Sequence, residues 1–105
     1  MNPTTEAKHR PVPSELLAVL TILGADDELK VKALPHVDIE RREVNWFAIS
    51  QNPFGSGHMA AIMWAKCLWS MRNPSHFNLF ERSFSMDDSL RAAVLRGIGI
   101  AWGLG

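Results

Sequence analysis

The sequence has no excess of charge of either sign, because eleven lysine and arginine residues balance eleven aspartate and glutamate residues over 105 positions. Nucleic-acid binders take much of their affinity from a basic surface that contacts phosphates, so we expect no nucleic-acid partner. The same balance argues against a polyacidic mimic of DNA. A protein near zero net charge associates readily with itself or with other proteins, because little repulsion separates the molecules.

Cysteine is almost absent, since Cys67 is the only one. A single cysteine cannot form a disulfide within the chain, and this favours a reducing, cytoplasmic compartment.

Residues 1–11 are polar and include two prolines. This segment lacks the apolar core of a signal peptide, so we expect a flexible tail rather than a secretory leader.

Long hydrophobic runs are absent too. The longest nearly apolar run, at residues 59–69, contains Lys66 and is too short to cross a bilayer, so we expect no membrane partner. The hydrophobic fraction of 47% is nonetheless that of an ordinary globular protein. Its aromatic part is unusual, with four tryptophans and five phenylalanines but no tyrosine.

The most informative segment begins at Phe54 and ends at Trp69. Glycines flank its first turn, and its later residues are apolar on nearly every side. A helix with that pattern must be enclosed by other elements. We therefore predict an all-α fold, a single small bundle of about five helices packed around a buried central helix at about residues 56–71. One helical domain would cover residues 12–105, after a tail of residues 1–11.

Capping residues and apolar spacing predict the other helices. Residues 14–23 form the first, which ends at Gly24. Residues 26–34 are ambiguous, because apolar and polar residues alternate from Leu29 to Ala33 as in a strand; a helix is favoured, since no partner strand is evident. A further helix is predicted over residues 38–51, capped by Asp38 and ended before Pro53.

The last predicted helix follows an aromatic connector at residues 77–84 that forms one or two helical turns. Ser85 and Asp88 have the spacing of a capping box, and apolar residues then recur every three or four positions as far as Ala101 or Trp102, facing the core. Gly97 and Gly99 weaken this helix by roughly 1 kcal/mol each relative to alanine. We expect their compensation to be close backbone approach to a neighbouring helix or to a partner chain.

The first turn of the central helix is the best candidate for a ligand site. Free backbone amides beside Gly55 and Gly57 could hold an anion, with hydrogen bonds from Ser56 and His58 and a charge from Lys66. The alternative is structural: Ser56 caps the helix, the glycines permit a tight turn, and the lysine ammonium reaches solvent. Ser56 and His58 do not form a nucleophile and base, because side chains two apart on a helix diverge.

Catalytic and metal-binding motifs are absent from the sequence. The four histidines form no local ligand pair with one another or with Cys67, which argues against a metal site. Asp87 and Asp88 are explained by the positive dipole of a helix start. Cys67 is expected to be a small core residue rather than a reactive thiol. We therefore expect no cofactor and no enzymatic activity.

Aromatic and methionine side chains exceed what a core of this size can hold. We expect an exposed apolar patch that binds another protein or a second copy of this chain. The predicted function is that of a small non-catalytic interaction module, an accessory, regulatory or inhibitory protein of bacterial or phage type. The alternative is a small-molecule or anion binder that uses the glycine-flanked helix start. The candidate interaction residues are Trp46, Trp69, Met71, Gly97, Gly99 and Trp102.

Overall fold

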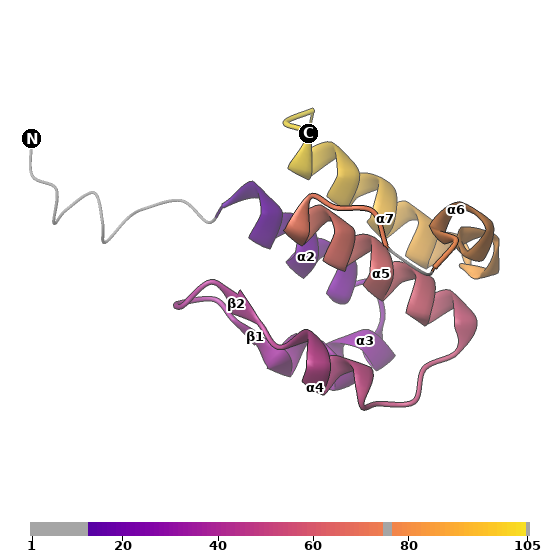
Figure 1. Ribbon diagram of the computed structural model, residues 1–105, viewed down its shortest axis with the longest axis horizontal. Coiled ribbons are helices and arrows are strands. Elements are labelled where there is room, and N and C mark those ends of the chain that lie inside the picture. The colour runs from indigo at the N-terminus through magenta and orange to yellow at the C-terminus, as the bar shows by residue number, and fades with distance from the viewer. Residues whose placement is uncertain (1–12, 75–76, 105) are drawn as a thin grey trace, which may run out of the picture.

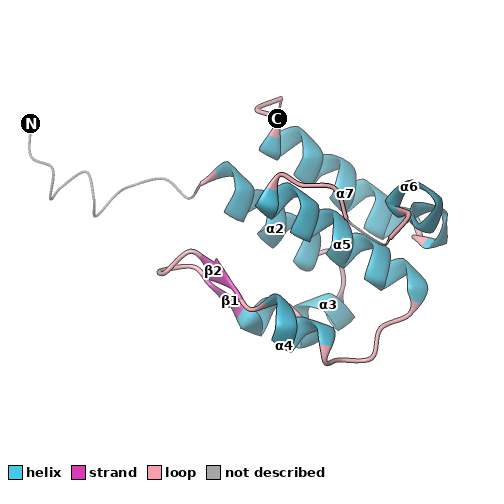
Figure 2. Cartoon of the chain, in the orientation of Figure 1, coloured by secondary structure: helices cyan, strands magenta, loops and turns pink. Residues whose placement is uncertain are grey.

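The computed structural model describes residues 13–74 and 77–104. The flexible tail predicted at residues 1–11 lies outside these ranges, as do residues 12, 75, 76 and 105 of the predicted domain. The described residues form six α-helices and one two-stranded sheet (Figures 1 and 2). The chain is thus the small all-α bundle that its sequence predicts.

Three long helices make up the bundle: α2 (Ser14–Leu23), α5 (Ser56–Ser70) and α7 (Asp88–Ala101). Each of them packs against the other two, and α5 also contacts α6 and the turn η2. Helix α2 coincides with the helix predicted at residues 14–23, and Gly24 follows its last residue. Helix α5 has the expected central position, but its large side chains are only partly covered. Its fully buried residues are Ala60, Ala61, Ala65 and Leu68.

Two glycines let these elements approach one another closely. A Cβ atom added to Gly97 of α7 would lie 2.8 Å from Cδ1 of Ile22 on α2. A Cβ atom added to Gly57 of α5 would lie 2.7 Å from the carbonyl oxygen of Ser85. Both distances are far shorter than an ordinary van der Waals contact. The expected approach to a neighbouring helix is therefore confirmed for Gly97, whereas Gly99 has no atom within 4 Å of an added Cβ.

The segment between α2 and α5 forms a second layer, drawn below the three long helices in Figure 1. It contains α3 (Asp27–Lys32) and the 3₁₀ turn η1 (Leu34–His36). Asp26 caps α3, because its carboxylate accepts a hydrogen bond from the backbone N–H of Leu29 at 3.0 Å. The favoured helical interpretation of residues 26–34 is confirmed.

The helix predicted over residues 38–51 is wrong for its first half. Strands β1 (Val37–Asp38) and β2 (Glu43–Val44) pair there as an antiparallel hairpin, and only α4 (Trp46–Ser50) is helical. The carboxylate of Asp38 does not start a helix but accepts the backbone N–H of Arg41 at 3.0 Å, inside the turn. Arg42 then adopts a left-handed φ of 58°, which turns the chain back into β2.

The connector between α5 and α7 contains α6 (Leu79–Arg82) and the 3₁₀ turn η2 (Ser83–Ser85). The prediction of one or two helical turns in this connector is confirmed. The predicted cap at Ser85 is wrong. Met86 is extended, and the N-cap of α7 is Asp87, whose carboxylate accepts the backbone N–H of Leu90 at 2.9 Å. Of the two residues predicted for the last core position of this helix, Ala101 packs against the core, whereas Trp102 is exposed.

Candidate interaction surface

A long apolar hollow lies between the α6–η2 segment and α7, with α5 as its floor. We refer to it as the α6–α7 groove. It has a volume of about 500 Å³, and apolar side chains dominate its lining. The residues that line it are Trp64, Phe80, Ser83, Phe84, Met86, Arg91, Val94, Leu95 and Ile98.

The rim of the groove is an ordered aromatic pair. Phe80 and Phe84 are four residues apart across α6 and η2, and their rings meet edge to face with centroids 5.4 Å apart and planes at 83°. This is a favourable geometry for two aromatic rings. Each ring supports the other while most of its surface faces solvent. The pair is therefore a rigid apolar edge rather than two loosely placed side chains.

The polar atoms around the groove already have partners within the chain. The indole N–H of Trp64 donates to the hydroxyl of Ser83 at 2.7 Å, and that hydroxyl donates to the carbonyl oxygen of Leu79 at 2.6 Å. The guanidinium of Arg91 donates to the carbonyl oxygen of Phe84 at 3.0 Å, which ties α7 to η2. These bonds hold the walls in place and leave mainly apolar surface inside the groove.

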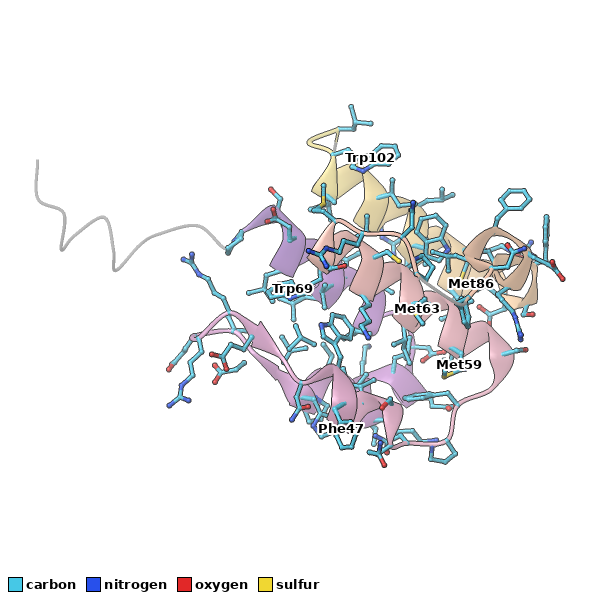
Figure 3. The ribbon with its side chains drawn as sticks, viewed as in Figure 1. Phe47, Met59, Met63, Trp69, Met86 and Trp102 are labelled. Atoms are coloured by element: carbon cyan, nitrogen blue, oxygen red, sulfur yellow. The ribbon has the colours of Figure 1, made fainter. Side chains whose placement is uncertain are left out.

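The apolar surface continues along α7 toward the C-terminus. Leu95, Ile98, Gly99 and Trp102 have the i, i+3, i+4, i+7 spacing that places residues on one side of a helix. Figure 3 shows Trp102 at one end of α7 and Met86, a wall of the groove, near the other end. We define the apolar face as the α6–α7 groove together with this α7 stripe and Leu104.

Five large side chains on the apolar face are 64–78% exposed: Phe80, Phe84, Leu95, Trp102 and Leu104. Scattered apolar residues are ordinary on protein surfaces, whereas a contiguous exposed patch is a candidate for an interaction site. An isolated exposed side chain provides a comparison, since Phe47 on α4 is 75% exposed but lies in the other layer of the fold.

The residues predicted for an interaction surface are dispersed over the structure. Gly99 and Trp102 lie on the apolar face. Trp46 and Trp69 are partly buried and pack against the core, and Gly97 is fully buried against α2. Met71 is exposed at the end of α5, where it has a left-handed φ of 56°. Most of the six residues therefore do not share one surface.

Sequence reasoning missed the residues that contribute most to the apolar face. Phe80 and Phe84 were assigned to a connector without a surface role, and Leu95 was not singled out. A signal for Leu95 was present, because it is a large apolar residue that falls beside Arg91 on the solvent side of an amphipathic helix. Phe80 and Phe84 also carry a signal. They are four residues apart, so they share one side of a helix, and their segment is too short to bury both rings.

The first turn of α5 does not bring the candidate anion-binding residues together. Its N-cap is Gly55, and Ser56 is exposed without a capping side-chain hydrogen bond. Gly57 packs on the backbone at Ser85. His58 points to a carboxylate, with its Nε2 atom 2.6 Å from Oδ2 of Asp26. Lys66 is exposed eight residues further on, which is about 12 Å along the helix axis.

The Asp26–His58 contact instead joins α3 to α5. Burial alone would raise the pKa of Asp26, but the backbone N–H of Leu29 and the imidazole of His58 outweigh it and hold this pKa below its ordinary value. The carboxylate thus caps one helix and binds a side chain of another. This double role is structural and accounts for His58 without a ligand.

A second hollow of about 440 Å³ lies beside the exposed side of α5, and Cys67 lines it with Met63, Lys66 and Phe77 among others. Burial raises the pKa of the Cys67 thiol, and the nearby charge of Lys66 only partly opposes this effect. The sulfur therefore remains a neutral thiol at physiological pH, which does not favour a nucleophilic role.

Within residues 13–74 and 77–104, no three histidine, cysteine, aspartate or glutamate side chains gather closely enough to hold a metal ion. No helix in these ranges has the length and hydropathy needed to cross a bilayer.

Comparison with known proteins yields no matching family model, no matching curated protein and no matching solved structure.

Proposed function

We propose that this protein is a non-catalytic interaction module, and that it binds another protein chain through the apolar face. One observation carries the proposal: exposed Phe80, Phe84 and Leu95 line one apolar groove together, and exposed Trp102 lies two helical turns beyond Leu95 on α7. The role that suits a single small domain of this kind is accessory, regulatory or inhibitory. Its one thiol suits a reducing compartment, and we place its action in the cytoplasm.

The size of the exposed surface supports this role. Aromatic and leucine side chains that are two-thirds exposed each present on the order of 100 Å² to solvent. Burying the four side chains named above would contribute roughly 10 kcal/mol at about 25 cal/mol per Å², before the costs of association are subtracted. This is enough for specific binding once the walls of the groove are already ordered.

The chemistry of the groove supports binding over catalysis. Ser83 and Arg91 are the polar side chains of its lining, and both are engaged in hydrogen bonds that hold the walls together. A reaction would need an acid, a base or a nucleophile aimed into the hollow. Apolar anchors with satisfied polar neighbours are instead the composition of an interface centre.

Site-specific photo-crosslinking tests the proposal. A photoreactive phenylalanine analogue is placed at Phe84 or Leu95, and in a matched control at Phe47, in protein expressed in its native host. We expect the first two variants to form the same discrete covalent adduct on irradiation, and the control to form none of it. Equal adducts from all three positions, or no adduct at Phe84 and Leu95, would overturn the proposal.

A further inference from the structure

We infer that the partner of the apolar face is a second copy of this chain, with the α7 helices of the two copies packed antiparallel. The inference rests on the proposed function, because it identifies the partner of that same surface. Leu95 on the wall of the groove, Gly99 and the projecting Trp102 lie along one side of α7 in the order that a two-fold axis requires.

Leu95 and Trp102 are spaced symmetrically along α7 about a point between Ile98 and Gly99. Trp102 and Leu95 are seven residues apart, about 10 Å along the helix axis, and Ile98 and Gly99 lie midway between them. A two-fold axis through that midpoint places Trp102 of each copy beside Leu95 of the other. In such an interface each contact occurs twice, because the same patch is used by both copies.

The contact formed in this way joins a projection to a hollow. Trp102 is 64% exposed at the end of α7, where Figure 3 shows it standing clear of the bundle. Leu95 lies on the wall of the α6–α7 groove, whose other side carries Phe84. The indole of one copy can therefore insert between the leucine and the phenylalanine of the other. Tryptophan in an apolar pocket is a common anchor of protein interfaces.

Gly99 allows the two helices to come together at the midpoint. An added Cβ atom would meet nothing within 4 Å, so the fold of one copy does not require a glycine there. Its cost to the helix, roughly 1 kcal/mol relative to alanine, has no compensation inside the chain. Close approach of a second copy supplies one, since the two-fold axis places Gly99 of each copy opposite Ile98 of the other, and the glycine leaves room for that isoleucine.

The exposed area is sufficient for a modest dimer. Covering all five exposed side chains of the apolar face would bury at most roughly 500–600 Å² per copy, or on the order of 1,000–1,200 Å² over a symmetric pair. Specific interfaces begin at about 1,200 Å² in total, so a reversible, concentration-dependent dimer is expected rather than a permanent one.

The charges next to the stripe set the salt dependence of the pair. Two copies of Arg91 would lie about 22 Å apart along the axis, beyond the Debye length of about 8 Å at physiological salt. Two copies of Arg96, which is exposed at the edge of the stripe, would lie about 8 Å apart along the axis. Added salt screens this repulsion, so we expect it to strengthen the dimer.

Sedimentation velocity over a dilution series of the full chain tests the inference. The wild type is expected to shift from the monomer mass of 11.7 kDa to twice that mass as concentration rises. Trp102→Ala and Leu95→Glu should each weaken dimerisation at least about tenfold, whereas Phe47→Ala should leave it unchanged. Gly99→Ala should weaken the dimer while stabilising the monomer, which separates an interface effect from a folding defect.

A mixing experiment tests the proposed contact itself. The Trp102→Ala variant has lost the projection and keeps the groove, whereas the Leu95→Glu variant has lost the groove wall and keeps the projection. Mixed together, they should form a heterodimer with one restored contact, at concentrations where each variant alone is a monomer. Separate tags on the two chains identify that species.

The outcomes distinguish this inference from the function on which it rests. A wild type that stays monomeric at every concentration, while Phe84 and Leu95 crosslink to a different protein, overturns self-association and keeps the interaction module. A dimer that survives Trp102→Ala, Leu95→Glu and Gly99→Ala also overturns the antiparallel α7 pair. A monomer that crosslinks to nothing through the apolar face overturns both proposals.

Discussion

Alanine substitutions at the two glycines of α7 should change stability in opposite directions. Either substitution removes a helix-interior glycine, which favours the folded state by roughly 1 kcal/mol. At Gly97 the new Cβ atom would lie 2.8 Å from Cδ1 and 2.9 Å from Cγ1 of Ile22, which is fully buried, and 3.3 Å from the carbonyl oxygen of Ala18. At Gly99 it would meet nothing within 4 Å.

The magnitudes decide the sign at each position. Overpacking a filled core costs about 1–3 kcal/mol, which exceeds the gain in helix propensity, so Gly97→Ala should lower the free energy of unfolding by about 1 kcal/mol. Gly99→Ala should raise it by up to about 1 kcal/mol. The two variants should therefore differ by about 2 kcal/mol, which corresponds to a difference in Tm of roughly 10 °C for a domain of this size.

Urea unfolding, followed by tryptophan fluorescence at concentrations where the chain is monomeric, measures both changes. A double-mutant cycle identifies the atoms responsible: Ile22→Val removes the Cδ1 atom that the new methyl group meets. Gly97→Ala should consequently cost less in the Ile22→Val background than in the wild type, even though Ile22→Val alone costs about 1 kcal/mol. If Gly97→Ala stabilises the wild-type chain as much as Gly99→Ala does, the close packing of α2 against α7 is wrong.

The remaining predictions concern the start of α5, the cap of α3 and the end of α5. Gly57→Ala should destabilise by about 1–3 kcal/mol, because the added methyl group meets backbone that cannot turn away, while Gly55→Ala should be nearly neutral in the same thermal denaturation assay. Asp26→Asn keeps a helix cap but removes the charge; since the pKa of Asp26 is lowered by folding, its stabilisation is present at neutral pH and is lost as pH falls below about 4. Acid unfolding should therefore be less steep in this variant than in the wild type. Met71→Gly should stabilise by up to about 1 kcal/mol in urea unfolding, because the residue is exposed and has a left-handed φ of 56°; a loss of stability would show that its side chain packs.

Local sequence signals are sufficient to predict the first helix. The first helix has Pro13 before it and Gly24 after it, and its apolar residues recur with helical spacing, so both ends were predicted to the residue. In residues 38–51, by contrast, an aspartate before a charged run suits either a helix start or a tight turn. The hydrogen bond from the backbone N–H of Arg41 to the carboxylate of Asp38 and the pairing of Val37 with Val44 decide for the hairpin.

The apolar face could be foreseen only in part. Composition indicated that the aromatic residues exceed the capacity of a small core, and Trp102 was among the candidates. Which rings remain outside depends on how α6 and η2 lie against α7, and local spacing does not determine that placement. Gly97 and Gly99 show why local sequence is not enough. Both are glycines inside the same helix, but Gly97 packs against Ile22, whereas Gly99 has open space beside it.

Fluorine NMR of the chain labelled with 5-fluorotryptophan tests the central claim most directly. Trp64 and Trp102 lie on the apolar face, whereas Trp46 and Trp69 pack against the core elsewhere. Single tryptophan-to-phenylalanine variants assign the four signals, which are then followed as the protein is concentrated and as host extract is added. The account predicts that the Trp102 and Trp64 signals shift or broaden together while those of Trp46 and Trp69 stay in place. Movement confined to Trp46 and Trp69, or four signals that never change, would contradict it.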